Sequence, residues 1–163
     1  MCCGTGNQLK LLKKHGIDGI GIDLSKAMLE IADSGKIKAN CFEQDAENIN
    51  FSDESFDMTM TTFALHEKSN FSAKKILNEM IRLTKKNGHL IIVDFSIDKN
   101  TFFFTRKGIS FIESLAGDDH YKHYKEYIGS NGLDTLLKDS PLKEVEKHYF
   151  AFNGVVLIVL SKL

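Results

Sequence analysis

The fold is decided near the start of the chain by residues 2–32, which read CCGTGNQLKLLKKHGIDGIGIDLSKAMLEIA. Apolar residues at helical spacing predict a helix over residues 7–15, and Gly16 is a typical residue to end it. A strand is predicted over residues 17–23, and Ser25 is placed to cap the helix that follows. A glycine-rich turn followed by this order of elements indicates βα units that build a parallel sheet.

The rest of the chain continues this alternation and then becomes helical. The further predicted elements are strands over residues 37–44, 56–63 and 89–95, a helix over residues 73–85 that Asn87-Gly88 closes, a helical segment over residues 101–139, and strands over residues 144–152 and 155–161. Because Asn153-Gly154 separates the last two strands, we expect an antiparallel hairpin at the end of a mostly parallel sheet.

Composition indicates a single domain over residues 1–163, because 42% of the residues are apolar and no repeat or linker divides the chain. With 21 basic and 22 acidic residues, the net charge of -1 gives no general attraction to nucleic acid, and a small molecule is the expected partner. The longest apolar run, residues 155–160, is too short to span a membrane. With no leader-like start, a cytoplasmic protein is expected.

The three cysteines, Cys2, Cys3 and Cys41, show no metal-ligand spacing, since there is no CxxC pair and no companion histidine. Reduced thiols are the simplest interpretation. The alternative is a redox-active pair at Cys2 and Cys3, next to the start of a helix that could lower a thiol pKa.

Two glycines and two acidic residues form a candidate cofactor site. Gly4 and Gly6 open directly into a helix, where the backbone N–H groups favour an anionic or polar ligand. Asp23 follows the next strand and could accept hydrogen bonds from ribose hydroxyls, although a helix cap is the alternative. Asp45-Ala46 follows the predicted strand over residues 37–44, at the same edge of the sheet, within reach of an adenine amino group.

These blocks together resemble a known family. The segments CCGTGNQLKLL, GIGIDLSKAMLEIA, FEQDAENINFSDESFD, TTFALHE and LTKKNGHLIIVDF follow the order and spacing of class I S-adenosylmethionine-dependent methyltransferases. The nearest branch is the type 11 group that includes the ubiquinone and menaquinone biosynthesis enzymes, and the resemblance covers nearly the whole chain. It implies a Rossmann-like three-layer α/β sandwich with S-adenosylmethionine as the cofactor.

The resemblance also implies a set of cofactor contacts. In the family pattern the turn containing Cys3, Gly4 and Gly6 wraps the methionine moiety, Asp23 holds the ribose, Leu24 and Met28 flank the adenine, Asp45 accepts from the adenine amino group, Ala46 adds a backbone contact, and Thr61 lies beside the methionine carboxylate or amine. Core packing is the alternative for Met28, and a loop cap is the alternative for Asp45.

The chain departs from the family pattern at its start. The family turn usually begins with glycine where this chain has Cys2, and the acidic residue that normally precedes the turn would fall before Met1. We therefore expect the chain to start partway through the first strand of the sheet, which is truncated.

Catalytic residues are hard to identify, because methyl transfer mainly requires alignment of the sulfonium with a nucleophile. His66 is the candidate general base, and Glu67 and Asp94 lie at the same predicted edge of the sheet. The alternatives are a core or helix-start histidine, a solvent-exposed glutamate and a loop-capping aspartate.

A helical cover over the acceptor site is predicted for residues 97–140. His120 and His123 could share a metal ion, but no third ligand has suitable spacing, so we expect aromatic lining or core with Tyr121 and Tyr124, and no metal. The TFFF run at residues 101–104 indicates an apolar acceptor or a lid, with core packing as the alternative.

The sequence therefore predicts an enzyme that transfers a methyl group from S-adenosylmethionine to a small-molecule acceptor. One alternative is a non-catalytic relic of the same fold with weak or no cofactor binding. A nicotinamide-dependent oxidoreductase is a third possibility, but it would require hydride-transfer residues that the chain does not show.

Overall fold

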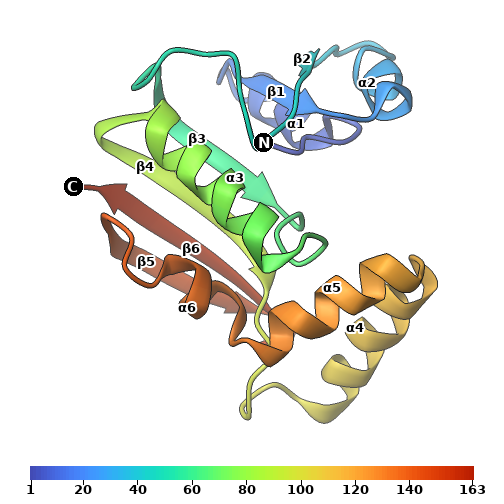
Figure 1. Ribbon diagram of the computed structural model, residues 1–163. Helices are drawn as coiled ribbons and strands as arrows, with labels where there is room; N and C mark the ends of the chain where they lie inside the picture. The colour runs from blue at the N-terminus through green and yellow to red at the C-terminus, as the bar shows by residue number, and fades with distance from the viewer. The chain divides into compact units, whose positions relative to one another are not determined.

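The computed structural model describes residues 1–163, which divide into two compact units, Met1–Phe51 and Ser52–Leu163 (Figure 1). Each unit has its own strands and helices and is described by itself. The expected single domain over residues 1–163 stays a prediction. No helix in either unit is long and apolar enough to cross a bilayer.

The first unit contains a pair of strands and two helices. Its elements are α1 (Asn7–Lys14), β1 (Ile20–Asp23), α2 (Lys26–Ala32) and β2 (Asn40–Glu43). β1 and β2 pair in parallel, so both strands end at the same edge, and the backbone N–H of Cys3 donates to the carbonyl of Ile22 at 2.9 Å. Both strands are shorter than predicted, but the expected cap of α2 is confirmed, because the hydroxyl of Ser25 accepts from the N–H of Met28.

The second unit is a four-stranded mixed sheet with four helices. Its elements are β3 (Phe56–Thr62), α3 (Asn70–Leu83), β4 (Thr84–Phe95), α4 (Phe103–Leu115), α5 (Asp118–Gly129), α6 (Gly132–Leu137), β5 (Leu142–Phe150) and β6 (Val155–Lys162). The strand order is β3-β4-β6-β5, in which β3 and β4 are parallel and the other two pairs are antiparallel. The predicted C-terminal hairpin is confirmed, whereas a mostly parallel sheet is not, because β1 and β2 form a separate ladder.

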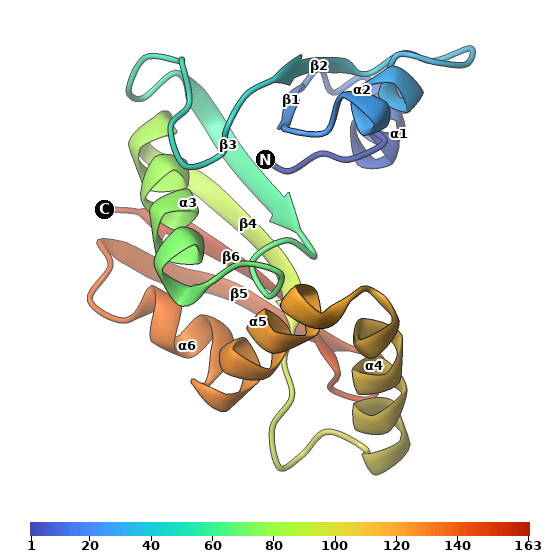
Figure 2. The same cartoon turned by 45° about the vertical axis from the view of Figure 1, so that its right-hand side comes forward.

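The core of the second unit lies under α3 and α6, which cover the same face of the sheet (Figures 1 and 2). Side chains alternate between buried and half-buried from Gly88 to Phe95 in β4 and along most of β6, as expected for strands with one covered face. The fully buried apolar side chains include Ile76, Leu77, Met80, Leu90, Ile92, Val156 and Ile158. The apolar stripe of α3 therefore anchors the strands whose ends carry the candidate site.

Two boundaries differ from the sequence prediction. The helix predicted over residues 73–85 spans Asn70–Leu83, because Ser69 caps it and Thr84 is already extended. The hydroxyl of Thr84 donates to the carbonyl of Met80 at 2.7 Å, and the helix ends at Leu83, five residues before Gly88. The hairpin connection is also wider than an Asn-Gly turn, since residues 151–153 all have left-handed backbone conformations.

Candidate functional site

Two groups of polar residues follow strand ends, one in each unit. The first group surrounds the glycine turn before α1 and includes Asp23 and Asp45. The second group, called the histidine cluster below, consists of His66, Asp94, Glu113 and His120.

Asp23 joins the end of β1 to the glycine turn. Its Oδ2 accepts from the backbone N–H of Gly4 at 2.7 Å, and its Oδ1 accepts from the N–H of Ser25 at 2.9 Å. Each carboxylate oxygen can accept more than one hydrogen bond, so these contacts orient the carboxylate and leave acceptor capacity for a ligand. The structure thus brings Gly4 and Asp23 together, and the bond to the N–H of Ser25, the cap residue of α2, also supports the helix-cap alternative, so the ribose contact stays a prediction.

The two glycines of the turn serve different purposes. Both have positive φ, 51° at Gly4 and 69° at Gly6, which other residues adopt at a cost. A Cβ at Gly6 would lie 2.7 Å from the Cβ of Ala39 and 3.0 Å from that of Ala32, whereas a Cβ at Gly4 would meet no atom within 4 Å. Gly6 therefore permits packing within the unit, and Gly4 leaves open space where a ligand could approach.

The other predicted contacts of the first unit lie in the segments that follow β1 and β2. Leu24 and Met28 are 63% and 42% exposed, so the core-packing alternative for Met28 is wrong. Asp45 follows β2, whose last residue pairs with Asp23, and its Oδ1 accepts from the N–H of Glu47 at 2.9 Å. The loop-cap interpretation of Asp45 thus has a hydrogen bond in its favour, and its second oxygen is left for the predicted adenine contact. Ala46 beside it is buried.

Cys3 lies in the glycine turn with its Sγ 3.5 Å from the Sγ of Cys41. Burial, together with the neighbouring Cys41 thiol, raises the pKa of Cys3 to about 12. A thiol that stays protonated is a poor nucleophile and is slow to oxidise. The structure therefore favours the interpretation of reduced thiols over a redox-active pair.

Thr61 lies on β3 in the second unit and is only 1% exposed. Its Oγ1 has no hydrogen-bond partner, unlike the hydroxyl of Thr59, which lies 2.8 Å from the hydroxyl of Thr84. A buried hydroxyl without a partner costs free energy in the folded chain, and it leaves a donor and an acceptor for a ligand. This agrees with, but does not test, the predicted contact between Thr61 and the methionine moiety of the cofactor.

His66 is held by Asp94 in the histidine cluster. The Nδ1 atom of His66 lies 2.6 Å from Oδ1 of Asp94, and Asp94 also accepts from the backbone N–H groups of Leu65 and Phe95. Burial alone would lower the pKa of His66, but the hydrogen bond and charge of Asp94, with the charges of Glu113 and Glu67, outweigh it and raise that pKa. Asp94 therefore fixes the ring of His66 and directs Nε2 away from β4.

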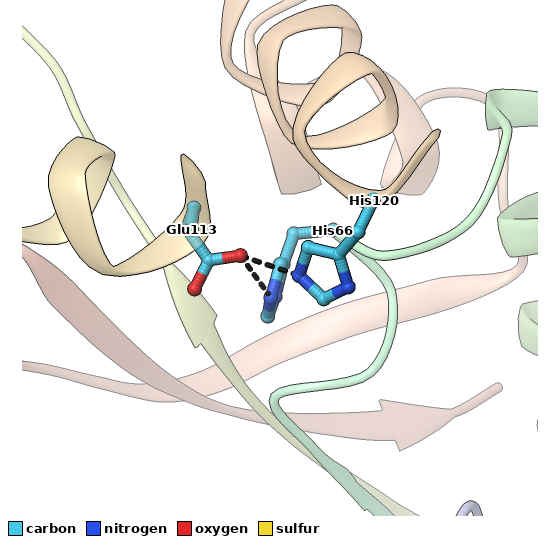
Figure 3. Close-up of side chains that lie close together, drawn as sticks. All are labelled: His66, Glu113 and His120. Atoms are coloured by element: carbon cyan, nitrogen blue, oxygen red, sulfur yellow. Dashed lines mark hydrogen bonds and ion pairs between the residues drawn. The ribbon is translucent and has the colours of Figure 1, made fainter. Parts of the chain in front are cut away.

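Glu113 on α4 and His120 on α5 complete the histidine cluster (Figure 3). One oxygen of Glu113, Oε2, lies 3.4 Å from Nε2 of His66 and 2.6 Å from Nε2 of His120. His123, which the sequence paired with His120, instead places its Nδ1 3.1 Å from the carbonyl of Glu67. Glu113 was missed because neither its spacing nor its apolar neighbours in the sequence distinguish it.

Aromatic rings surround His66. Its ring centroid lies 4.6 Å from that of Phe95 and 6.4 Å from those of Tyr124 and Tyr127. Tyr124 is 4% exposed, which agrees with the core interpretation, and a role in lining the acceptor site stays a prediction. In the TFFF run at residues 101–104, Thr101 is buried, but the three phenylalanine side chains are more than half exposed, so core packing is wrong for them.

Comparison with known proteins identifies the family. Residues 1–92 match the family described as "Methyltransferase domain". A demethylmenaquinone methyltransferase of Thermotoga maritima is 29% identical over 161 residues, covering 92% of this chain and 68% of the relative. A demethylmenaquinone methyltransferase of Paenarthrobacter aurescens is 32% identical over 96 residues, covering 59% of this chain and 37% of the relative.

Solved structures show the same fold. A SAM-dependent methyltransferase of Methanosarcina mazei aligns with a TM-score of 0.69 at 20% identity, covering 99% of this chain and 89% of that one. The magnesium protoporphyrin IX methyltransferase of Synechocystis, solved with bound SAH, aligns with a TM-score of 0.68 at 16% identity, covering 99% of this chain and 72% of that one. The sequence match and the shared fold place this chain in the methyltransferase domain family, with the α/β fold of class I methyltransferases.

Proposed function

We propose that this protein transfers a methyl group from S-adenosylmethionine to a small-molecule acceptor. The observation that carries the proposal is the contact between Gly4 and Asp23, which orients a carboxylate beside an open glycine turn. A carboxylate in this position suits the two hydroxyls of a ribose. The family supports methyl transfer, and the non-catalytic alternative has no observation in its favour.

The chain's own residues would hold the cofactor along the edge of the β1–β2 pair. Asp23 would accept from the ribose hydroxyls, Asp45 from the adenine amino group, and the exposed Leu24 and Met28 would flank the adenine ring. Cys3 and Gly6 shape the turn, and Ala46 supports the loop of Asp45. In the second unit, the unpartnered hydroxyl of Thr61 is the group that the family pattern assigns to the methionine moiety.

In the reaction, the bond between the sulfonium sulfur and the methyl carbon breaks as the bond between that carbon and the acceptor atom forms. Sulfur keeps the electron pair and leaves as the thioether of S-adenosylhomocysteine. A protonated acceptor must also lose its proton, and we propose that Nε2 of His66 takes it. Asp94 supports this role, because its bond to Nδ1 fixes the ring and stabilises the charged imidazolium.

The acceptor side of the site belongs to the segment over residues 97–140, in which α4 and α5 carry Glu113 and His120 against His66. Phe102, Phe103 and Phe104 are exposed at the start of α4 and favour an apolar acceptor. The two relatives named above are demethylmenaquinone methyltransferases, so a demethylmenaquinone is the first acceptor to test.

The experiment uses S-adenosylmethionine with a labelled methyl group and follows label that passes into solvent-extractable product. Transfer should require the protein, and His66→Ala should lower the turnover number by about 100-fold while the affinity for S-adenosylhomocysteine is retained. His148→Ala is the matched control, because His148 is an exposed histidine beside a glutamate on β5. Normal turnover in His66→Ala would show that His66 is not the base, and binding without transfer to any acceptor would favour the non-catalytic alternative.

A further inference from the structure

Three side chains from separate elements point their ligand atoms at one another in the histidine cluster (Figure 3). They are Nε2 of His66 in the loop after β3, a carboxylate oxygen of Glu113 on α4, and Nε2 of His120 on α5, and these atoms all lie within 4.8 Å of one another. Two imidazoles and one carboxylate form a ligand set that catalytic zinc sites use with a fourth position left open.

Asp94 prepares His66 for this role. A histidine that binds a metal through one nitrogen almost always donates the other N–H to a carboxylate or carbonyl, which fixes the ring and the tautomer. The 2.6 Å contact between Nδ1 of His66 and Asp94 has this form and leaves Nε2 toward Glu113. Asp94 is fully buried and is itself held by two backbone N–H groups, so the support is rigid.

The buried residue of helix α4 is a glutamate, whereas large apolar side chains of the same helix are exposed. Glu113 is the one buried residue of α4, at 6% exposed, whereas Phe111, Ile112 and Leu115 beside it are 65%, 65% and 72% exposed. Burying a carboxylate costs free energy unless it is paired, and burying these apolar side chains would instead stabilise the fold. The orientation of α4 therefore places Glu113 between the two histidines at the expense of apolar burial.

The distances from the Glu113 carboxylate to the two histidine nitrogens are close to those between the ligands of a zinc ion. Ligand atoms at about 2.05 Å from a tetrahedral zinc ion lie about 3.3 Å apart. Oε2 of Glu113 already lies 3.4 Å from Nε2 of His66, and its 2.6 Å hydrogen bond to His120 must open by about 0.7 Å on binding. His120 can make this movement, because its side chain is 22% exposed and lies in the first turn of α5.

We infer that His66, Glu113 and His120 bind a divalent transition-metal ion, with Asp94 as the supporting carboxylate of His66. The carboxylates of Glu113 and Asp94 balance the two positive charges of such an ion. Zinc is the first candidate, and Fe²⁺ accepts the same ligand set.

The inference rests on the proposed function for the chemistry of the ion, but the binding of the ion does not depend on methyl transfer. An ion with three protein ligands keeps a position at which an acceptor oxygen can bind, and a Lewis acid at that oxygen lowers the pKa of its proton. With the ion bound, Nε2 of His66 is a ligand and cannot take the proton, so the ion would replace the base role proposed above for His66, while the proposed methyl transfer itself is unchanged. The metal ion and S-adenosylhomocysteine are titrated separately, so failure of one proposal is distinguished from failure of the other.

The test titrates chelator-treated full-length protein with Zn²⁺ by calorimetry, repeats the titration anaerobically with Fe²⁺, and follows Co²⁺ by its visible absorption. One ion should bind each chain, and Co²⁺ should show the intense absorption of a low-coordinate site with nitrogen and oxygen ligands. Glu113→Gln, which keeps the shape of the side chain, should weaken binding by about 100-fold or more, and Asp94→Asn by about 10- to 100-fold. His120→Ala, at a partly exposed position, gives the same answer if Glu113→Gln alters the fold.

Three controls define the site. His123→Ala removes the histidine one turn from His120, His148→Ala removes an exposed histidine beside Glu146, and Cys3→Ser removes one thiol of the Cys3–Cys41 pair. All three should bind the ion like the unmodified protein. The inference is overturned if the unmodified protein binds no ion, if Glu113→Gln and His120→Ala bind as well as it does, or if Cys3→Ser alone abolishes binding.

Discussion

Thr61→Val should stabilise the metal-free, ligand-free protein while weakening its affinity for the cofactor. The hydroxyl of Thr61 is buried, at 1% exposed, and has no partner, so the folded chain bears its desolvation cost without a compensating hydrogen bond. That cost is about 1 to 3 kcal/mol for a neutral group, and a methyl group of similar size removes it. If the hydroxyl binds the methionine moiety, the same change removes about 0.5 to 1.5 kcal/mol of binding free energy.

Thr59→Val is the matched control, because Thr59 lies two residues earlier on the same face of β3. Its hydroxyl is paired with that of Thr84 at 2.8 Å, and Thr84 also keeps its bond to the carbonyl of Met80. The control should therefore lower the free energy of unfolding by about 0.5 to 1.5 kcal/mol. Replacing threonine by valine should thus raise the free energy of unfolding at position 61 and lower it at position 59.

Urea unfolding followed by tyrosine fluorescence measures this effect in the correct part of the chain. All four tyrosines, at positions 121, 124, 127 and 149, lie in the unit over residues 52–163, and the chain has no tryptophan. The midpoint should rise for Thr61→Val and fall for Thr59→Val with unchanged slope. A lower midpoint for Thr61→Val would refute the reasoning, since it would mean that the hydroxyl has a partner in solution.

Further predictions concern the first unit. Gly6→Ala should lower the melting temperature, because the new Cβ would lie 2.7 Å from the Cβ of Ala39 and the backbone has φ 69°. Gly4→Ala, whose Cβ would meet no atom within 4 Å, should cost less stability and should reduce cofactor binding instead. Equal losses of melting temperature in the two variants would contradict this assignment. Asp45→Asn should keep the hydrogen bond to the N–H of Glu47, and hence the melting temperature. It should weaken cofactor binding in a calorimetric titration, because an amide NH₂ group would face the adenine amino group. A lower melting temperature with intact binding would show that the role of Asp45 is structural.

The sequence predicted most elements because local signals and apolar periodicity agreed. Ser25 has the cap chemistry that starts α2, and the apolar stripe of α3 matches its buried face. The boundary at Thr84 was missed, since Thr84 pairs with Phe56 of β3, a long-range contact that has no local signal in the sequence. Strand pairing across the chain was likewise not predicted in detail, because it is set by long-range packing.

The glycine turn and its partner Asp23 could be predicted because they follow consecutive elements at a fixed spacing. The histidine cluster could be predicted only in part. Asp94 lies near the end of β4 and His66 lies in the loop after β3, but Glu113 lies among the apolar residues of α4, a pattern that usually predicts an exposed charge. The burial of Glu113 results from the way α4 packs, and no spacing rule in the sequence links Glu113 to His66, which lies 47 positions earlier.

The most direct test of the central claim is a calorimetric titration of the full chain with S-adenosylhomocysteine, compared with Asp23→Ala and with Asp18→Ala as an exposed control just before β1. The account predicts binding by the unmodified protein and by Asp18→Ala, and a loss of about 1.5 to 3 kcal/mol in Asp23→Ala, which is about 10- to 150-fold in the dissociation constant. An unchanged dissociation constant in Asp23→Ala, with the protein still folded, would contradict the assignment of β1 and the glycine turn as the cofactor site.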